Sequence, residues 1–379
     1  MDYGIYIHIP FCIVKCIYCD FYSITGRDDD IPDFIDAICN EIKSSARRIK
    51  EPGILHIRTI FIGGGTPSLV NAKWIEKILN TISDTYDMST IREVTIEANP
   101  GEAPFQRLKD FRSIGINRLS MGFQSLQPEL LSFLSRIHSP ETCFDTFNHA
   151  RQAGFENINV DMIYNIPGQS IYQWQDDLTR LIDLEPEHFS AYSLTVEKST
   201  MLYSLVNSER VKMPSEERDI EFFQATNDIL SSVGFPRYEI SNFAKPGFEC
   251  DHNLGYWKMI PYLGFGPSAH SYDGHKRWWN TSSLDHYLKQ VTLGKSPISG
   301  SEVLSENNKF NELIFNGLRM TGGVAIEKLE RHYQGLFQSY LKQAIEKWPQ
   351  LRHKDGYLKL SEKGILLADE ISADLFVLQ

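Results

Sequence analysis

The sequence predicts an α/β protein that starts with a partial (β/α)6 TIM-like barrel and ends with a mainly helical, winged-helix-like domain. Two observations predict the barrel: apolar strands alternate with amphipathic helices up to about residue 200, and polar or glycine-rich clusters follow the strands. Alternating strands and helices imply a parallel sheet with right-handed crossovers, whose functional residues lie at the carboxyl ends of the strands. A third observation, the loss of this alternation after about residue 200, predicts further domains.

The strands and helices of the barrel are predicted from the spacing of apolar residues. Residues 3–9 alternate and are rich in Ile and Tyr, which is typical of a strand. Residues 31–50 carry Phe34, Ile38 and Ile42 at helical spacing, with acidic residues early and basic residues late, as the helix dipole favours. The other predicted strands cover residues 57–62, 92–97, 117–121, 157–163 and 188–195. The other predicted helices cover residues 72–85, 103–114, 128–135, 140–153 and 170–183.

Polar and glycine-rich clusters occur at the ends of these strands or within them. They are the cysteine loop 12–19, the Gly-Gly-Gly-Thr turn 63–66, residues 97–100, residues 122–125, and Asp161 in the fifth strand. Because the carboxyl ends of parallel strands meet at one edge of a barrel, a single site built from these clusters is the simplest interpretation.

The pattern changes in the second half of the chain. A helix at about 215–233 precedes an aromatic segment, Tyr238 to Trp279, that is expected to be loop-rich, and residues 300–302 are predicted to form a linker. The sequence of residues 302–379 predicts mostly helices, with a short strand at 357–360. The predicted domains are the barrel, 1–235; the aromatic segment, 236–300; and the C-terminal domain, 301–379.

Composition limits the class of protein. An apolar content of 42% and an aromatic content of 12% exclude a disordered chain. The net charge of −11 argues against nucleic-acid binding through overall charge. The first residues lack a cationic region, and no apolar run reaches the about 18 residues needed to span a bilayer. We therefore expect a cytoplasmic protein with no nucleic-acid partner and no integral membrane segment.

Three cysteines, Cys12, Cys16 and Cys19, follow the first strand at the spacing C-x3-C-x2-C. Iron–sulfur cubanes are normally held by four thiolates, so three would leave one iron open to another ligand. A zinc site is an alternative, but no nearby Cys or His completes the usual set of four ligands. A disulfide framework is another, and the reducing compartment expected for this chain disfavours it.

The cysteine loop also carries a family resemblance, because Tyr18 precedes the last cysteine and Y-x-H-I-P-F-C precedes the loop. This stretch resembles the radical S-adenosylmethionine (SAM) proteins and, within them, the coproporphyrinogen oxidase-like branch. The resemblance implies a radical SAM barrel with a [4Fe-4S] cluster on the three cysteines. It implies SAM cleavage to methionine and a 5′-deoxyadenosyl radical, and therefore an electron donor as a partner. The residues that match the SAM positions of the family are Tyr6, Gly64, Gly65, Thr66, Glu97, Gln124, Arg136 and Asp161.

The residue types at these positions suit the cofactor. Glycine lets a ligand approach the backbone, Gln and Asp at strand ends suit ribose hydroxyls, and Arg can hold a carboxylate through two hydrogen bonds. Each position also has an ordinary structural interpretation, such as a tight turn, a surface ion pair, a cap or a core side chain.

Two features bear on the branch of the superfamily. Oxygen-independent coproporphyrinogen III oxidases carry an N-terminal extension and a further Cys after the triplet, whereas this sequence has Asp20 and Phe21 there. The later stretch H-N-x-x-Y-W resembles the heme chaperones of the superfamily. This second resemblance implies heme binding by His252, Asn253, Tyr256 and Trp257.

Neutral imidazole is a common axial ligand of heme iron, and aromatic rings offer flat apolar faces to the macrocycle. His252 is therefore the predicted iron ligand, with Asn253 orienting it, and His270 and Cys250 are competing ligands. Cys39 and Cys143 fall on predicted helices, where a free Cys acts as a small apolar residue.

The leading hypothesis is a heme chaperone that binds heme or a related tetrapyrrole and passes it to an acceptor protein. In this hypothesis SAM cleavage would serve a regulatory or transfer step. The alternative is a radical SAM enzyme that decarboxylates the propionates of coproporphyrinogen III. A third hypothesis is radical SAM modification of RNA or protein. The negative net charge of the chain disfavours RNA as the substrate.

Overall fold

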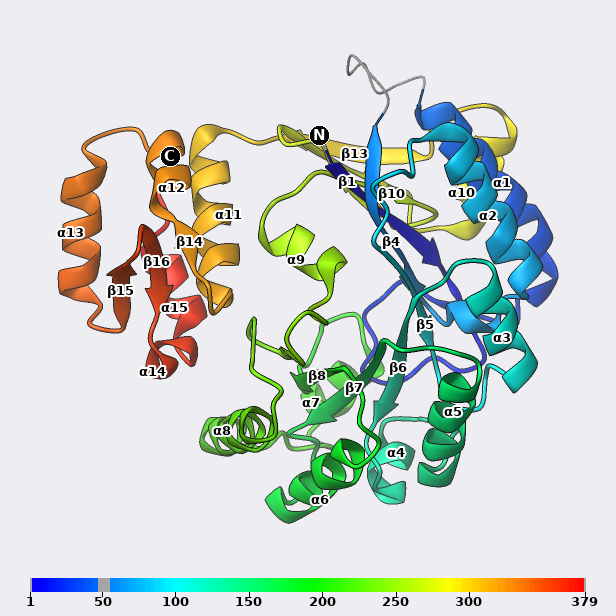
Figure 1. The fold of residues 1–379 in the computed structure, drawn as a ribbon, viewed down its shortest axis with the longest axis horizontal. Helices are drawn as coiled ribbons and strands as arrows, with labels where there is room; N and C mark the ends of the chain where they lie inside the picture. Colours follow the sequence, from blue (N-terminus) through cyan, green and yellow to red (C-terminus); the bar gives the residue numbers. More distant parts are fainter. Residues whose placement is uncertain (1, 47–54, 378–379) are drawn as a thin grey trace.

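The structure, a computed structural model, describes residues 2–46 and 55–377 (Figure 1). Its barrel wall consists of parallel strands that neighbour one another in chain order, which confirms the predicted fold class. These strands are β1 (Asp2–Ile9), β4 (His56–Gly64), β5 (Glu93–Ala98), β6 (Arg118–Gln124), β7 (Ile158–Tyr164) and β8 (His188–Ser193).

Helices cover the outer face of this sheet (Figure 1). They are α1 (Ile31–Ser45), α2 (Ala72–Thr85), α3 (Phe105–Ser113), α4 (Pro128–Phe133), α5 (Pro140–Gln152) and α6 (Ile171–Ile182). Each buries one apolar stripe, as α2 does with Ile75, Ile78 and Ile82. The helix predicted at 31–50 ends at Ser45, and its predicted end, 47–50, lies outside the described residues.

Side chains along β1 alternate between the two faces of the sheet, because successive residues of a strand point in opposite directions. Ile5, Ile7 and Ile9 are fully buried in the core under the helices. Tyr6 and His8 point the other way, into the barrel interior, where their side chains hydrogen-bond to each other.

The expectation of a loop-rich segment from Tyr238 to Trp279 was wrong. This segment holds helix α9 (Asp251–Trp257) and the strands β9 (Asn242–Ala244), β10 (Tyr262–Phe265), β11 (His270–Tyr272) and β12 (Lys276–Asn280). β10 pairs in parallel with β1, and β11 and β12 continue the sheet in antiparallel fashion. These strands are too short to show a clear alternation, so their periodicity gave no signal.

The predicted linker at residues 300–302 was also wrong, because these residues lie in β13 (Ile298–Val303), which pairs with β12. Gly300 sits against the indole of Trp279, and a Cβ at this position would lie 2.4 Å from the ring. The glycine therefore allows close packing across the two strands and does not provide flexibility. With β13 at one end and β9 at the other, the main sheet has eleven strands in the order β13-β12-β11-β10-β1-β4-β5-β6-β7-β8-β9.

Several smaller elements connect the barrel to its surroundings. Strands β2 (Phe11–Cys12) and β3 (Ile24–Thr25) pair beside the cysteine loop. Helix α7 (Met201–Asn207) is fastened to this loop, since the amide of Leu202 donates to the carbonyl of Ile17 at 2.8 Å. Helix α8 (Glu216–Ser232) confirms the helix predicted at 215–233, and α10 (Leu284–Thr292) packs beside α1 (Figure 1).

The C-terminal part has a core of its own and stands apart from the barrel in Figure 1. Its helices are α11 (Glu306–Arg319), α12 (Ile326–His332), α13 (Phe337–Lys347), α14 (Glu362–Ile365) and α15 (Ala368–Asp374). They pack with a small antiparallel sheet of β14 (Val324–Ala325), β16 (Tyr357–Leu360) and β15 (Leu351–Lys354). The strand predicted at 357–360 is confirmed as β16, and helix α11 contacts α9.

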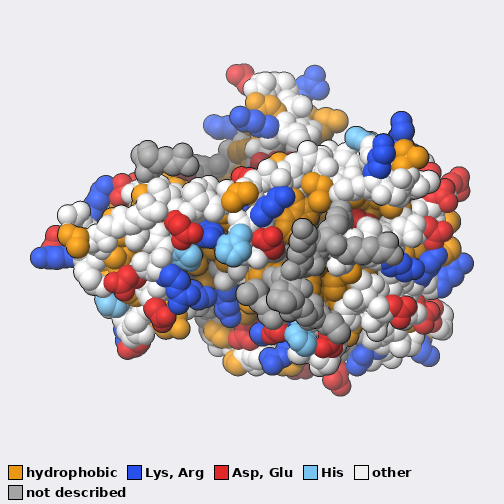
Figure 2. Space-filling model, turned by 90° about the horizontal axis from the view of Figure 1, so that it is seen from above, with side chains coloured by type: hydrophobic (Ala, Val, Ile, Leu, Met, Phe, Trp, Pro, Cys, Tyr) orange, Lys and Arg blue, Asp and Glu red, His pale blue; other side chains and the backbone are white. Residues whose placement is uncertain are grey.

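The distribution of surface charge and the length of the helices concern the expected classes of partner. On the face seen in Figure 2, acidic and basic side chains are interspersed, without the single-sign field that favours nucleic acid. Among residues 2–46 and 55–377, no helix has the length and apolar character needed to cross a bilayer.

Candidate functional site

The three predicted cluster cysteines lie together at the carboxyl end of β1, in a partly buried loop. Burial raises the pKa of Cys12 to about 11 and raises the pKa of Cys19, and neighbouring thiol charges add to both shifts. Two donors point at the sulfurs: Thr66 Oγ1 lies 3.6 Å from Cys12 Sγ, and Arg136 Nη1 lies 3.5 Å from Cys16 Sγ. The loop therefore gathers thiols that would become thiolates only with a bound cation.

The described residues contain no group of three Cys, His, Asp or Glu side chains placed to hold a single metal ion. In an iron–sulfur cluster each thiolate binds its own iron, so the three thiols need not converge on one point. The residues present thus fit a cubane with one open iron.

The glycine turn after β4 packs directly on the cysteine loop. The amide of Gly65 donates to the carbonyl of Ile9 at 2.8 Å, and the amide of Thr66 donates to the carbonyl of Phe11 at 2.8 Å. A Cβ on Gly65 would lie 2.7 Å from the Phe11 carbonyl oxygen and 2.9 Å from Cys12 Sγ. The glycines therefore allow the turn to hold the cysteine loop in place.

Arg136 lies at the centre of the predicted SAM-binding residues. Its Nη2 donates to Asn99 Oδ1 at 2.6 Å and to the Gly122 carbonyl at 2.8 Å. Its buried Nε has no hydrogen-bond partner among the described residues. Gln124 adopts a φ of 69° and approaches Gly122 so closely that a Cβ there would lie 2.8 Å from Gln124 Nε2. An unpaired guanidinium nitrogen beside the cysteine loop suits a carboxylate.

Three further predicted residues, Tyr6, Glu97 and Asp161, face the barrel interior and influence one another electrostatically. Burial, together with the charge of Asp161, raises the pKa of Glu97 to about 8, although Glu97 Oε2 accepts from the amide of Gly64 at 3.0 Å. Burial also raises the pKa of Asp161. The structure thus gathers the predicted SAM set around the cysteine loop and the strands beside it.

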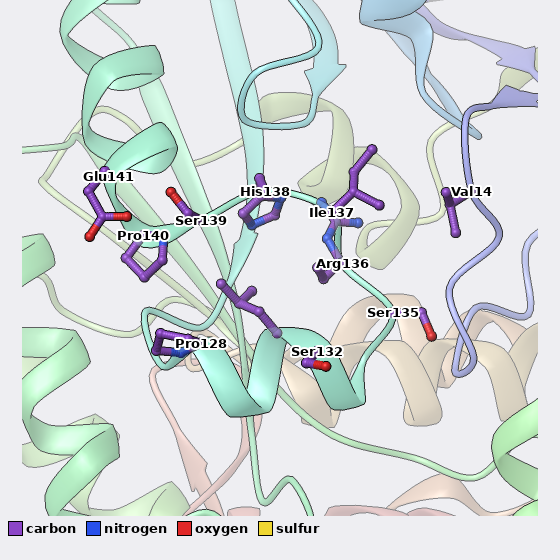
Figure 3. A pocket seen from close by; sticks show the side chains of 11 residues that line it. Val14, Pro128, Ser132, Ser135, Arg136, Ile137, His138, Ser139, Pro140 and Glu141 are labelled. Carbon is purple, nitrogen blue, oxygen red and sulfur yellow. The ribbon is translucent and has the colours of Figure 1, made fainter.

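A pocket of about 440 Å³ opens beside the cysteine loop (Figure 3). Val14 of that loop lies on one side, and the segment between α4 and α5, including Arg136 and Ile137, forms the other. Ile137 is 58% exposed and Val14 is 39% exposed, so apolar side chains border this opening. The pocket links the surface to the residues that contact the cysteines.

The four predicted heme residues lie on α9, which packs against β4 and accepts support from Glu93 of β5 at its first residues. His252 is only 3% exposed, and both of its ring nitrogens are engaged. Nδ1 lies 2.8 Å from Thr59 Oγ1, and Nε2 lies 2.9 Å from the hydroxyl of Tyr256. Burial, with a contribution from the cation Arg118, lowers the pKa of His252 to about 3. Ligation of iron by this imidazole would require the loss of one hydrogen bond.

The other predicted heme residues and the competing ligands have different environments. Asn253, Tyr256 and Trp257 are partly exposed. Cys250 is fully buried, and its Sγ donates to Glu93 Oε1 at 3.3 Å. His270 is exposed and stacks on Trp279 with ring centroids 5.8 Å apart.

A pocket of about 320 Å³ lies between α9, the strands β10 to β12 and α11. Its walls are mostly aromatic or apolar, with a polar edge. They consist of Tyr256, Trp257, Met259, Ile260, Tyr262, Tyr272, Arg277, Glu312 and Asn316. A second cavity of only about 20 Å³ borders His252. Tyr256, Ile260 and Tyr262 line both, so they form the wall between them.

A buried acid that was not among the predicted site residues, Glu93, fixes the start of α9. Glu93 Oε2 accepts from the amide of Asp251 at 2.9 Å, and Glu93 Oε1 accepts from the amide of His252 at 3.2 Å. Arg118, which is 2% exposed, contributes the opposite charge. Both residues lie in predicted strands. A charged side chain within an otherwise apolar strand could have identified each of them.

A chain of hydrogen bonds, also not predicted, joins Asp161 to α9. Asn159 Nδ2 donates to Asp161 Oδ1 at 2.8 Å, and Asn159 Oδ1 lies 2.6 Å from His188 Nδ1. His188 Nε2 lies 2.8 Å from the hydroxyl of Tyr238, which accepts from the amide of Cys250 at 3.3 Å. Alternation along β7 could have identified Asn159, because it lies two residues before Asp161 and therefore on the same face.

Comparison with known proteins gives consistent matches. Residues 6–181 match the model of the radical SAM superfamily, and residues 304–367 match that of the HemN C-terminal domain. The chain is 34% identical to the heme chaperone HemW of Bacillus subtilis (strain 168), over 97% of each chain. It is 34% identical to the heme chaperone HemW of Lactococcus lactis subsp. lactis, over 97% of this chain and 95% of that protein.

Among solved structures, the fold is similar to that of coproporphyrinogen III oxidase (HemN) from Escherichia coli, a radical SAM enzyme, with a TM-score of 0.83. The two sequences are 23% identical, and the match covers 99% of this chain and 90% of the other. This likeness extends to the C-terminal part.

Proposed function

Because this chain belongs to the HemW heme chaperone family, within the radical SAM superfamily, we propose that it binds heme and transfers it to an acceptor protein. The observation that carries the proposal is the position of the H-N-x-x-Y-W stretch: its Tyr256 and Trp257 line the aromatic pocket of about 320 Å³ beside α9. Flat aromatic walls suit a porphyrin, and an opening between two parts of a molecule suits a ligand that must be released.

In this proposal Cys12, Cys16 and Cys19 would hold a [4Fe-4S] cluster in the barrel, and the residues around them would bind SAM. When bound and reduced by an electron donor, these groups supply one-electron cleavage of the sulfonium. Thr66 and Arg136 donate toward the sulfurs, which stabilises their thiolate form. The unpaired Nε of Arg136 is available to a carboxylate, and Asp161 to ribose hydroxyls.

The remaining members of the proposed SAM site act as supports. Tyr6 donates to His8 Nδ1 at 3.0 Å, and His8 Nε2 donates to the carbonyl of Tyr22 at 2.7 Å, which fixes both rings near the cysteine loop. Glu97, with a pKa of about 8, is largely protonated at neutral pH and can donate a hydrogen bond from one oxygen. Gly64 and Gly65 let the turn after β4 pack against His8 and the cysteine loop, and Gln124 lies beside Gly122.

The heme site is proposed on α9, with His252, Asn253, Tyr256 and Trp257 as its residues. The test is an absorption titration of the purified protein with hemin, for wild type, His252→Ala and the control His286→Ala. His286 is an exposed histidine on α10. We expect a saturable Soret band in wild type and in His286→Ala, and about tenfold weaker binding in His252→Ala, since each lost hydrogen bond or ligand contact costs about 1.4 kcal/mol or more.

The second step of the test measures transfer. Heme-loaded protein is mixed with an apo-heme protein, and the Soret band of the acceptor is followed over time. Absence of a saturable band in wild type would contradict the proposal. In that case, consumption of coproporphyrinogen III under anaerobic, reducing conditions with SAM becomes the decisive assay, because it would assign the chain to the decarboxylase class.

A further inference from the structure

We propose that Arg237 and Arg319 form a carboxylate-binding site between the barrel and the C-terminal part, and that this site takes a propionate group of the bound tetrapyrrole. The inference deepens the heme binding proposed above and rests on it. Neither arginine was among the predicted site residues. The site follows from buried guanidinium nitrogens that have no acceptor among the described residues.

Arg237 lies between the barrel helix α8 and the C-terminal helix α14. Its guanidinium group lies over the ring of Phe223 in α8, with Cζ 5.3 Å from the centroid, and the charge of Glu362 in α14 acts on it. Helix α14 is at the end of the C-terminal part that faces α8 (Figure 1). The Nε and Nη1 atoms of Arg237 are buried, yet neither has a hydrogen-bond partner among the described residues. Buried donors are normally paired, because an unpaired one has lost its water without compensation.

Arg319, at the end of α11, approaches the same region from the C-terminal part. Its Cζ lies 3.7 Å from the ring centroid of Phe315, and its Nη2 pairs with Asp369 of α15 at 2.5 Å. The side chain of Asp369 is mostly exposed, whereas that of Arg319 is only 13% exposed. The buried Nη1 of Arg319 has no hydrogen-bond partner among the described residues. One side of this guanidinium group is therefore also left for another acceptor.

The backbone brings the two arginines to one place. Glu239, two residues after Arg237, forms an isolated antiparallel bridge with Met320, the residue after Arg319. The charge of the Glu239 carboxyl group acts on both guanidinium groups. Two cations from different parts of the molecule thus lie around one buried acid.

Glu239 does not neutralise these cations. It is 1% exposed, and its Oε1 accepts from the amide of Ser241 at 3.2 Å, while its buried Oε2 has no partner among the described residues. Within those residues neither arginine forms an ion pair with it. Burial raises the pKa of Glu239 to about 7, so it is partly protonated at neutral pH. In that form it can donate from Oε2 to a carboxylate held by the arginines.

The electrostatics distinguish this pair from other buried arginines. For Arg118 and Arg136, burial lowers the pKa less than the nearby acids, phenols and thiols raise it, so the net shift is upward. For Arg237 and Arg319, burial outweighs the nearby acids and the pKa is lowered. The pair therefore lacks negative charge, and guanidinium groups bind carboxylates through strong, charge-assisted hydrogen bonds.

A ligand at this site has access to the barrel interior. Tyr192 of β8 points inward on the same face as Ser190, because alternate residues of a strand share a face. Its side chain is nevertheless 41% exposed, and the charges of Asp161 and Glu239 both act on it. Solvent therefore reaches the inner surface between the proposed SAM residue Asp161 and the arginine pair.

The other neighbour of the site is the aromatic pocket. Asn316 lines that pocket and lies one helical turn before Arg319 in α11. Among the ligands of the proposed function, SAM carries one carboxylate, for which Arg136 is available, and heme carries two propionates. A propionate is therefore the carboxylate that remains for Arg237 and Arg319.

The test compares hemin with hemin dimethyl ester, in which both propionates are uncharged, by absorption titration. The proteins are wild type, Arg237→Gln, Arg319→Gln, the double variant and the control Arg331→Gln. Arg331 is an exposed arginine of α12 that pairs with Glu327. We expect wild type and the control to bind hemin about tenfold more tightly than the ester, as for one charge-assisted hydrogen bond. This preference should shrink in each single variant and disappear in the double variant.

The ester also controls for folding. Its affinity should be the same in wild type and in all variants, because a misfolded protein would lose the binding of both ligands. The position of the Soret band should also stay the same, since neither arginine contacts the iron in this inference. Thermal unfolding of the heme-free proteins with added phosphate or acetate tests whether a free anion occupies the site instead.

The possible failures are distinguishable. Equal affinities of wild type for hemin and its ester would overturn this inference and leave the heme-binding function intact. A preference for hemin that persists in the double variant would also overturn it, because the propionates would then be held elsewhere. Equal affinities together with stabilisation of wild type, but not of the double variant, by phosphate or acetate would assign the site to a free anion and overturn the inference. Absence of saturable hemin binding in wild type would overturn the proposed function and, with it, the inference.

Discussion

Among single residues, the barrel interior favours protonation states that differ from those in water. Glu97 has a pKa of about 8, His8 of about 4 and His252 of about 3, in each case with burial as the largest cause. At neutral pH the carboxyl group is therefore largely protonated and both imidazoles are neutral. Desolvation thus removes charge from the interior and leaves neutral hydrogen-bonding groups around the proposed cofactor sites.

The raised pKa of Glu97 predicts a pH dependence of stability. Its folded-state pKa exceeds the ordinary value of 4.5, so the folded state binds more protons, and wild-type stability falls as pH rises from 4.5 to about 8. Glu97→Gln keeps an acceptor for the Gly64 amide and lacks this titration. We expect the variant to gain about 2 kcal/mol relative to wild type between pH 5 and pH 8, as measured by denaturant unfolding of the cofactor-free protein.

The matched control for this experiment is Glu249→Gln, a partly exposed carboxylate that accepts from the amide of Gly247 at 3.0 Å. Its free-energy difference from wild type should stay constant over the same pH range. A constant difference for Glu97→Gln as well would contradict the assignment of a raised pKa.

Gly65 gives a second residue-level prediction, because a Cβ there would collide with the Phe11 carbonyl oxygen and with Cys12 Sγ. Gly65→Ala should push the cysteine loop away from the turn and destabilise the folded state by about 1–3 kcal/mol. The control is Gly322→Ala, where nothing lies within 4 Å of the added atom. Iron and sulfide bound per chain after anaerobic reconstitution should fall in Gly65→Ala and remain unchanged in Gly322→Ala.

The sequence pattern predicted only part of the candidate functional site. The cysteine spacing and the polar strand ends are local signals, and the structure brings those residues together. The enclosure of His252 had no local signal, since Thr59, Phe61 and Gly4 surround it from strands far away in the chain. Glu93 was missed for the same reason, because it is 157 residues away from Cys250, to which it bonds.

Among the helices and strands, α9 is held at its start by a side chain from another element. Glu93 of β5 accepts the amides of Asp251 and His252, as a capping residue would, and takes the Cys250 Sγ–H as a third donor. A helix of only seven residues would be marginal without such support. The position of the proposed heme residues therefore depends on an acid buried in the barrel.

Glu93→Gln should loosen α9 specifically. The amide side chain offers one acceptor oxygen where the carboxylate offers two, and Arg118 loses the negative charge of Glu93. We expect a loss of about 1–3 kcal/mol in stability and faster hydrogen exchange at residues 251–257, measured by mass spectrometry. Exchange in α13, which belongs to the separate C-terminal core, serves as the internal control, and unchanged exchange in α9 would contradict this role.

The strands added after the barrel show why element prediction failed there. β10 has four residues and β11 has three, and each pairs with partners that the local sequence does not reveal. Glycine and serine at positions 300 and 301 resemble a linker in composition, yet Gly300 is needed for the approach to Trp279. Long amphipathic elements such as α2 were predictable because their pattern repeats over several turns.

For the molecule as a whole, the C-terminal part is joined to the barrel near the proposed heme site. The amide and hydroxyl of Thr321 both donate to the carbonyl of Tyr238, each at 3.1 Å, and α11 contacts α9. Tyr238 also belongs to the hydrogen-bond chain between Asp161 and Cys250. One tyrosine thus connects the proposed SAM site, the proposed heme site and the C-terminal core.

The pairing of β1 also constrains how the protein can be made. β1 lies inside the sheet and needs β10 on one side, with Gly4 paired to Tyr262, as well as β4 on the other. During translation, β1 must wait for more than 250 further residues before its second edge is covered. Until then its unpaired edge can bind a strand of another chain, so we expect the nascent barrel to depend on chaperones that shield this edge.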